Sequence, residues 1–218
     1  MLAWLSVNLL WSQGSSIVFI LLVSSIFGLL FYRPLFYACI LFLLFSLYFF
    51  RNPERQCSAA RADDAVLVCP ADGTVVNIQF DEHDGLNGYA QKVSIFLSPF
   101  DAHVMWTPMA GEVERVVYKT GAFTFAFLPK SSELNERNDI ILHNASHGTV
   151  MVRQIAGTFA RRICCWVHAG DVLPIGHKYG MIRFGSRVDL FLPATVTLMV
   201  SIGQKVLGGH TQLGKWNK

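Results

Sequence analysis

Hydrophobic residues are concentrated at the start of the chain, where they form two long uncharged runs. The first run covers residues 15–32 and the second residues 35–50, with Arg33 and Pro34 between them. A helix rises about 1.5 Å per residue, so the first run would reach about 27 Å, close to the ~30 Å hydrocarbon core of a bilayer. Proline disfavours helix in the residue before it, which predicts a turn here. Residues 1–50 are therefore predicted to form a membrane anchor of two short helices, at about 15–32 and 35–50.

Positive charges beyond the second run predict the side of the membrane. Arg51, Arg55 and Arg61 follow this run, whereas no charged side chain precedes Arg33. Because Lys and Arg near helix ends favour the cytoplasmic side, we expect the remainder of the chain on the cytoplasmic face of the inner cell membrane. Two alternatives stay open: a hairpin that enters only one leaflet, since both runs are short, and a buried hairpin of a soluble fold. A cleavable signal peptide fits poorly, because the N-terminus lacks a positively charged region.

After about residue 65 the pattern changes to short β-type runs separated by Gly, Pro, Asn and Asp, which is typical of an all-β sandwich or barrel. A weak helical pattern occurs only at 155–161. Similar Pro-x-x-Gly-x-Val segments at 70–75 and 108–113 resemble the hybrid-type β-sandwich of lipoyl-like domains and leave a duplication open. We predict one domain over residues 51–218, with strands at 65–68, 74–80, 92–97, 111–118, 139–143, 149–155, 162–166, 189–192 and 197–202.

Composition excludes some classes of protein. The net charge of +3 is small and dispersed, with no Lys/Arg run, so no nucleic-acid partner is expected. The cysteines are odd in number and show no CxxC spacing, which favours buried free thiols over a zinc site or a disulfide framework. They are Cys39, Cys57, Cys69, Cys164 and Cys165.

Seven short motifs follow one another in an order that resembles the phosphatidylserine decarboxylase proenzymes, in their short form with an N-terminal hydrophobic anchor. Each motif alone is weak, but the ordered set is specific and covers roughly residues 49 to 213. The motifs are Phe-Arg-Asn-Pro-Glu-Arg at 50–55, Pro-Ala-Asp-Gly at 70–73, Ser-Pro-Phe-Asp-Ala-His-Val at 98–104, Asn-Glu-Arg-Asn at 135–138, Gln-Ile-Ala-Gly at 154–157, Ala-Arg-Arg-Ile at 160–163 and Arg-Phe-Gly-Ser-Arg-Val-Asp at 183–189.

The resemblance implies self-cleavage between Gly185 and Ser186 into a large and a small chain that stay associated. Ser186 Oγ would attack the Gly185 carbonyl, and β-elimination with loss of ammonia would leave a pyruvoyl group, a covalent pyruvate cofactor, derived from Ser186. Phosphatidylserine in the membrane would form a Schiff base with it, lose CO2 and leave as phosphatidylethanolamine. The same chemistry on another serine phospholipid such as archaetidylserine is an alternative. A homo-oligomer stays open, and no metal is implied.

The resemblance also assigns two residues to proton transfer. His103 matches the histidine that protonates the substrate carbanion, a task suited to a pKa near 6.5. Asp72 matches a triad acid that orients a histidine, although an Asp-Gly pair is also an ordinary turn. Where other branches of the family carry a second histidine that helps self-cleavage, this chain has Trp106. Either His103 serves both steps or another base acts, with His143 and His147 as unassigned candidates.

Arginines provide candidates for binding the lipid phosphate through bidentate hydrogen bonds. The candidates are Arg137, Arg161 and Arg162. Alternatively, these arginines form ion pairs that hold strands together, with Glu136, Asp139 or Asp189 as partners.

Two other classes of protein are alternatives to this interpretation. A zinc peptidase on a β-scaffold needs closely spaced ligands such as His-x-His, and the sequence contains none. A membrane-tethered, lipoyl-like binding scaffold needs a lysine on a tight hairpin, and no lysine lies in such a context.

Overall fold

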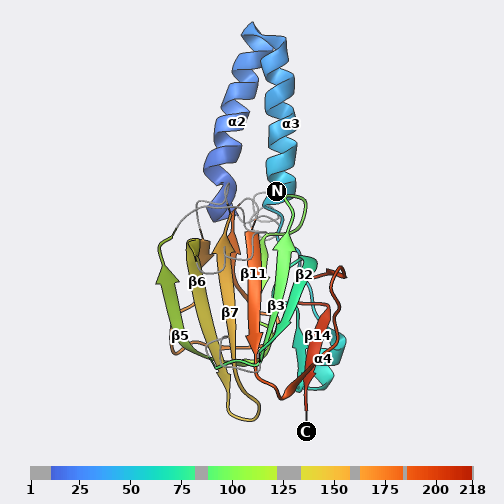
Figure 1. Cartoon of the computed structure of the whole chain (residues 1–218). Helices are drawn as coiled ribbons and strands as arrows, with labels where there is room; N and C mark the ends of the chain where they lie inside the picture. The colour runs from blue at the N-terminus through green and yellow to red at the C-terminus, as the bar shows by residue number, and fades with distance from the viewer. Residues whose placement is uncertain (1–10, 82–87, 122–133, 158–162, 184–185, 218) are drawn as a thin grey trace. The chain divides into compact units, whose positions relative to one another are not determined.

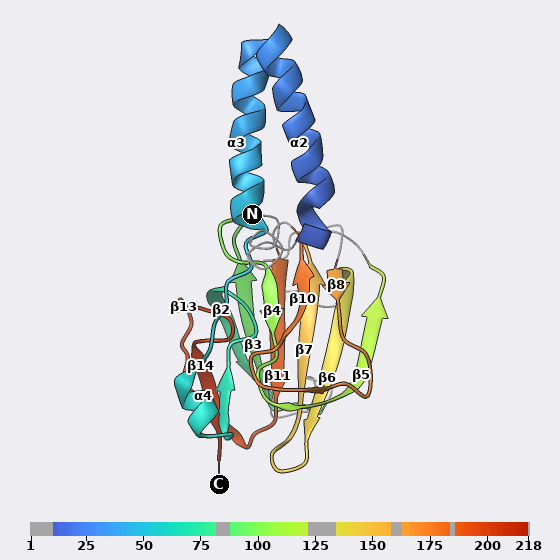
Figure 2. The same cartoon turned by 180° about the vertical axis from the view of Figure 1, so that it is seen from behind.

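The computed structural model describes residues 11–81, 88–121, 134–157, 163–183 and 186–217. The chain divides into two compact units, Met1–Glu54 and Arg55–Lys218, and each is described by itself. The first unit is helical and the second consists mainly of β-strands, as Figures 1 and 2 show.

Two helices, α2 (Trp11–Phe31) and α3 (Arg33–Phe49), make up the described part of the first unit. The predicted helices are present, but the turn differs from the prediction. Tyr32 alone breaks the helix, in an extended conformation, and Pro34 lies in the first turn of α3. Proline is favoured there because the first helical amides have no partner within the helix. Gly28 allows the hairpin to close tightly, since a Cβ at this position would overlap the backbone of Phe36.

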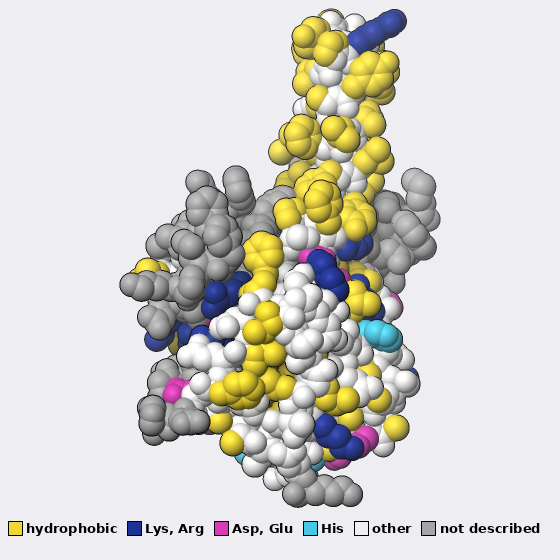
Figure 3. Space-filling view, turned by 45° about the vertical axis from the view of Figure 1, so that its right-hand side comes forward, with side chains coloured by type: hydrophobic (Ala, Val, Ile, Leu, Met, Phe, Trp, Pro, Cys, Tyr) yellow, Lys and Arg dark blue, Asp and Glu magenta, His cyan; other side chains and the backbone are white. Residues whose placement is uncertain are grey.

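The apolar side chains of these helices are largely exposed, as Figure 3 shows. Gln13–Phe31 is long and apolar enough to cross a membrane, and only 22% of its most apolar window is buried. A hairpin buried in a soluble core would cover these side chains, so the exposure argues against that alternative. Length and composition thus support membrane association in a coarse sense, whereas the side of the membrane and the depth of insertion remain predictions.

The second unit contains a short helix, α4 (Ser58–Ala62), and three antiparallel sheets. The largest sheet has eight strands in the order β13-β2-β3-β11-β7-β6-β5-β9, and two smaller sheets have the orders β4-β10-β8 and β1-β14-β12. The strands are β1 (Val66–Val68), β2 (Gly73–Phe80), β3 (Gln91–Leu97), β4 (Val104–Trp106), β5 (Gly111–Lys119), β6 (Arg137–Asn144), β7 (Gly148–Ala156), β8 (Ile163–Cys165), β9 (Val172–Leu173), β10 (Lys178–Ile182), β11 (Ser186–Leu192), β12 (Val196–Leu198), β13 (Lys205–Val206) and β14 (Gln212–Trp216).

The mainly β prediction with N-terminal helices is confirmed, and each predicted strand overlaps an observed one. The helical pattern at 155–161 is wrong at its start, because Ile155 and Ala156 end β7. The prediction missed β4, β9, β10, β13 and β14, of which β10 and β14 are each interrupted by a glycine. In both strands the glycine lies where a neighbouring strand comes close: a Cβ at Gly180 would overlap a carbonyl of β8, and one at Gly214 would lie 2.7 Å from the Thr197 carbonyl. The hybrid type of sandwich and its duplication remain predictions.

The main core lies between the large sheet and the β4-β10-β8 sheet, which Figures 1 and 2 show on one side of it. Alternate residues of the central strands supply this core from the large sheet, and β4 and β10 supply it from the other layer. Fully or almost fully buried members are Ile95, Leu97, Met105, Ile140, Val152, Tyr179, Ile182, Val188 and Leu190.

Candidate active site

Ser186 is the first residue of β11, at the centre of the large sheet. It lies directly opposite Leu97 of β3 and Ala156 of β7, and it is fully buried. Its Oγ has no hydrogen-bond partner among the described residues. Gly185, the other residue of the predicted cleavage site, lies outside the described residues. The sheet thus holds the candidate nucleophile by its backbone on both sides while leaving its hydroxyl unpaired.

The smaller layer brings His103 to the same end of the fold as Ser186. Met181 of β10 pairs with Val104 of β4, and the Ile182 amide donates to the His103 carbonyl over 3.3 Å. Only three residues separate Ile182 from Ser186 along the chain. His103 and Ser186 therefore approach this end from opposite layers, as sequence reasoning alone could not have shown.

The imidazole of His103 is fully buried and fixed in orientation. Its Nδ1 lies 2.9 Å from the Asp101 carbonyl oxygen, to which it donates. Asp101 itself ends a tight turn, where its carboxylate accepts from the Ser98 amide at 2.8 Å and from the Ser98 hydroxyl at 2.7 Å. Since Nδ1 carries the proton in this hydrogen bond, Nε2 is the nitrogen of the neutral ring that can accept one.

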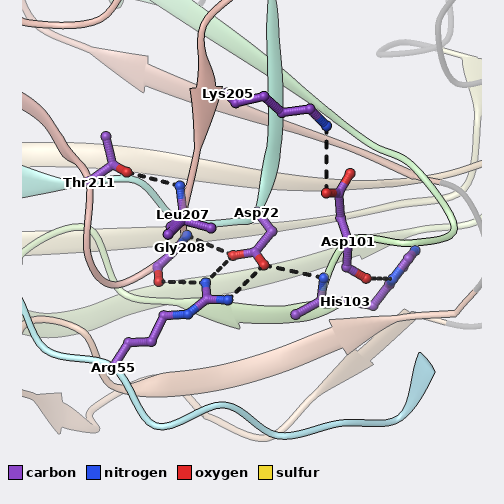
Figure 4. Close-up of polar contacts among 9 residues, drawn as sticks. Arg55, Asp72, Asp101, His103, Lys205, Leu207, Gly208 and Thr211 are labelled. Carbon is purple, nitrogen blue, oxygen red and sulfur yellow. Dashed lines mark hydrogen bonds and ion pairs between the residues drawn. The ribbon is translucent and has the colours of Figure 1, made fainter. Parts of the chain in front are cut away.

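Asp72 is almost completely buried, and its carboxylate lies in a dense set of hydrogen bonds (Figure 4). Arg55 binds it through both terminal nitrogens, with Nη2 2.9 Å from Oδ2. The Gly208 amide donates to Oδ1 at 2.9 Å and the Ala102 amide to Oδ2 at 3.3 Å. Through Ala102, the carboxylate contacts the backbone directly before His103. These contacts support a role for Asp72 in holding the histidine loop.

Arg55 is a residue of this site that the sequence interpretation missed, since it used Arg55 only to assign membrane orientation. Besides binding Asp72, its guanidinium lies 5.2 Å from the centre of the Trp106 ring. The indole is fully buried against Gly208 and Gly209, where a Cβ would collide with the ring. Trp106, at the position where the resemblance implies a second histidine in other branches of the family, therefore packs against the cation that pairs with Asp72. The available signal was the arginine at the end of the motif at 50–55.

Thiols near the site are protonated at physiological pH. Burial raises the pKa of Cys69 well above its usual range, and the nearby charge of Asp72 raises it further. Burial also raises the pKa of Cys165. All five cysteines are free in the structure, which agrees with the prediction of reduced, buried thiols for four of them; Cys165 is half-buried. A protonated thiol is a poor nucleophile, so neither cysteine competes with Ser186.

His143 and His147, the other candidate bases, lie at the far end of β7. His143 is opposite Thr149, and its Nδ1 contacts that hydroxyl at 3.0 Å. His147 stacks on the ring of Trp216. From Thr149 to Ala156, the residue opposite Ser186, a strand covers roughly 24 Å. The structure therefore brings His103, and neither of these histidines, to the end of the fold at which Ser186 lies.

The candidate phosphate ligands are only partly described. Arg137 begins β6, opposite Lys119 and Ile155, and is partly exposed. Arg161 and Arg162 lie outside the described residues. Two of the three acidic residues suggested as alternative partners bind other arginines: Asp139 pairs with Arg153 and Asp189 with Arg187, each at 2.7 Å.

Comparisons with known proteins cover this site. A family model described as phosphatidylserine decarboxylase matches residues 42–214. The phosphatidylserine decarboxylase proenzyme of Syntrophus aciditrophicus (strain SB) is 44% identical over 172 residues, which make up 78% of this chain and 79% of that protein. The protein of the same name from Burkholderia vietnamiensis (strain G4 / LMG 22486) is 44% identical over 175 residues, or 80% of both chains. The family match includes Arg55, Asp72, His103 and Ser186.

Proposed function

This chain belongs to the phosphatidylserine decarboxylase family, and we propose that it cleaves itself between Gly185 and Ser186 and then converts phosphatidylserine to phosphatidylethanolamine and CO2. The observation that carries the proposal is the position of Ser186. Its hydroxyl is buried and has no partner among the described residues, while its strand is paired on both sides. A buried hydroxyl without a hydrogen bond costs about 1–3 kcal/mol, so an ordinary structural serine would be expected to have found one.

Self-cleavage involves the hydroxyl oxygen and the nitrogen of Ser186 and the carbonyl group of Gly185. Oγ forms a bond to the Gly185 carbonyl carbon, the bond from that carbon to the Ser186 nitrogen breaks, and the proton of Oγ passes to this nitrogen. The resulting ester eliminates the Gly185 carboxylate and leaves an enamine at residue 186. This group tautomerises to an imine, and water hydrolyses the imine to ammonia and the pyruvate-derived keto group. When present, this group supplies an electron sink for decarboxylation. The central, buried position of Ser186 fits a group that must be shielded from water.

We assign His103 to proton transfer at residue 186. Among the candidate histidines of the described residues, it is the one at this end of the fold, and the hydrogen bond of its Nδ1 to the Asp101 carbonyl leaves Nε2 as the acceptor nitrogen. We assign Asp72 and Arg55 to positioning, because their ion pair fixes the Ala102 amide beside His103. Arg137, Arg161 and Arg162 remain proposed ligands of the lipid phosphate.

The apolar helices fit a lipid substrate. Gln13–Phe31 could hold the domain at the membrane, where phosphatidylserine resides. We propose that residues 51–218 face the cytoplasm, that both chains of the proenzyme remain together after cleavage, and that β11 stays bound between β3 and β7.

The denatured mass of the purified protein tests the proposal. We expect a large chain of residues 1–185 and a small chain that begins at residue 186 and resists Edman sequencing, whereas Ser186→Ala should remain one intact chain. Incubation with phosphatidylserine should release CO2 and form phosphatidylethanolamine, and a parallel assay with archaetidylserine separates the two lipid types. Wild-type protein that decarboxylates while uncleaved would refute the proposed mechanism.

A further inference from the structure

Gln154 is a buried polar residue beside Ser186 to which no role has been given. On β7 it lies opposite Val188, and two residues further along the same strands Ala156 lies opposite Ser186. Because side chains alternate between the faces of a strand, Gln154 and Ser186 point to the same face, into the core. Diagonal neighbours on one face are about 7–8 Å apart at the backbone, within reach of a long side chain.

Asn138 fixes the orientation of the Gln154 amide. It lies directly opposite Gln154 on β6, and its Nδ2 donates to Gln154 Oε1 at 3.0 Å. Both side chains are buried, to 2% exposure or less. With Oε1 occupied, the NH2 group is turned away from Asn138 into the interior. It reaches the opposite layer, where a Cβ at Gly180 would lie 3.0 Å from Nε2.

The Nε2 donor of Gln154 has no hydrogen-bond partner among the described residues, and neither has Ser186 Oγ. The fold therefore places an unused donor and an unused oxygen on the same face of neighbouring strands. Leaving a buried donor unpaired costs about 1–3 kcal/mol, and a methionine would fill the same volume without this cost. An orphaned buried group of this kind calls for an explanation in ligand binding or reaction.

We propose that the Gln154 carboxamide is a further catalytic residue of self-cleavage, which donates a hydrogen bond to Ser186 Oγ while that oxygen departs. This inference rests on the proposed function. In the elimination, a base removes the proton from the Ser186 Cα, the electron pair forms the Cα–Cβ double bond, and the Cβ–Oγ bond breaks. Its electrons go to the Gly185 carboxylate, of which Oγ is then a part. A neutral donor in a water-free interior stabilises the negative charge that develops on this oxygen.

The geometry favours this step over the initial attack. Gln154 and Ser186 are diagonal neighbours on the core face of paired strands, so the donor lies on the side of the sheet from which Oγ projects. Asn138 positions Gln154 in turn, since its hydrogen bond decides whether the nitrogen or the oxygen of the amide faces Ser186. Asn138 is therefore a positioning residue for the same step.

Gln154→Met tests the proposal, because it preserves the volume and removes the donor. We expect cleavage to slow by about 10²–10³-fold, the usual loss when one donor to a developing oxyanion is removed. Gln91→Met is the matched control. Gln91 is a buried glutamine at the far end of β3, and its Nε2 is fully used by the carbonyls of Pro193 at 3.1 Å and Val196 at 2.7 Å. This control should lower thermal stability and leave the cleavage rate unchanged.

Hydroxylamine identifies the step that is slowed. It attacks esters, so it should split Gln154→Met precursor into a large chain ending in a hydroxamate and a small chain with a free Ser186 amine, readable by Edman sequencing. Gln154→Met precursor that is slow but resists hydroxylamine would place Gln154 before ester formation and overturn the assigned step. Cleavage of Gln154→Met at the wild-type rate would overturn the whole proposal.

Asn138→Asp provides a second variant should Gln154→Met fail to fold, as judged by circular dichroism. Aspartate can only accept, so the Gln154 amide should turn its nitrogen toward residue 138 and its oxygen toward Ser186. We expect slow, hydroxylamine-sensitive cleavage, and a wild-type rate would count against the proposal. Failure of the proposed function is distinguishable, because wild-type protein and the Gln91→Met control would then both remain uncleaved.

Discussion

The two faces of β11 are equally buried but chemically different. Toward the core the strand presents Val188 and Leu190 after Ser186. Toward the other face it presents Arg187 and Asp189, both at most 4% exposed. On that face two ion pairs follow one another across neighbouring strands, because Asp189 lies opposite Arg153 and Arg153 lies opposite Asp139.

The difference lies in whether the polar groups are paired. On the outer face each guanidinium binds its carboxylate through two hydrogen bonds, at 2.7 and 2.8 Å in both pairs. On the core face Ser186 Oγ and Gln154 Nε2 have no partners among the described residues. Burial alone therefore does not mark a functional group. The paired charges hold strands in register. Ser94 Oγ, opposite Asp189, is also buried without a partner among the described residues, so the missing hydrogen bond singles out Ser186 and Gln154 only together with their position beside the predicted cleavage site.

The largest effect is expected at His103, which lies at the same end of the fold as the unpaired groups. Without a positioned acid or base, His103→Ala should lose about 10²–10⁴-fold in turnover. Single-turnover CO2 release on phosphatidylserine measures this loss, and processing gels show whether cleavage still occurs. An uncleaved His103→Ala protein would mean that one histidine serves both steps, and full turnover would remove His103 from the mechanism.

Removing the ion pair between Arg153 and Asp139 on the outer face should lower the stability of the protein and leave self-cleavage unchanged. Asp139→Ala leaves Arg153 buried without its partner, and removal of one member of a buried ion pair costs about 3–5 kcal/mol. Urea unfolding should show this loss, with cleavage retained under conditions where the protein folds. The double variant Asp139→Leu with Arg153→Met is the control, because well-packed apolar residues often replace such a pair at little or no cost. A cleavage defect in a stable double variant would contradict a purely structural role.

Asp72 combines the two situations: its carboxylate is paired, like those of the outer face, but it lies next to the candidate catalytic residue His103. Asp72→Asn keeps the shape but weakens the bonds to Arg55 and to the Ala102 amide, and hydrogen bonds to a charged group contribute about 1.5–3 kcal/mol. We expect uncleaved precursor to accumulate, which denatured mass would detect. Arg55→Lys should give a milder defect of the same kind, because lysine retains the charge but not the bidentate geometry. Normal processing and activity of Asp72→Asn would exclude Asp72 from the mechanism.

Local pattern was sufficient to predict the two apolar helices and six strands of the large sheet, but not its short edge strands β9 and β13. It could not predict β10, where Gly180 breaks the alternation because β8 and Gln154 come close to its Cα. Ser186, His103 and Asp72 were identified by their motifs, but their convergence depends on long-range pairing: β4 pairs with β10, and β11 pairs with β3 and β7. Arg55 and Gln154 lay within quoted motifs, yet only the tertiary structure shows what each side chain contacts.

The smallest effect is expected at an ion pair that resembles the outer-face pairs in geometry but not in burial. Lys215 Nζ lies 2.6 Å from Asp63 Oδ2, and both side chains are between 40% and 50% exposed. Water already solvates both charges, and holding a flexible lysine costs entropy, so exposed pairs contribute about 0.2–1 kcal/mol. Lys215→Met should therefore change the free energy of unfolding by less than ~1 kcal/mol and leave cleavage unaffected.

The small effect of Lys215→Met should shrink further in 1 M salt, which screens exposed charges, whereas the cost of Asp139→Ala should persist because its charges are buried. Equal losses from the two variants would show that pairing, and not burial, decides what an ion pair contributes in this fold.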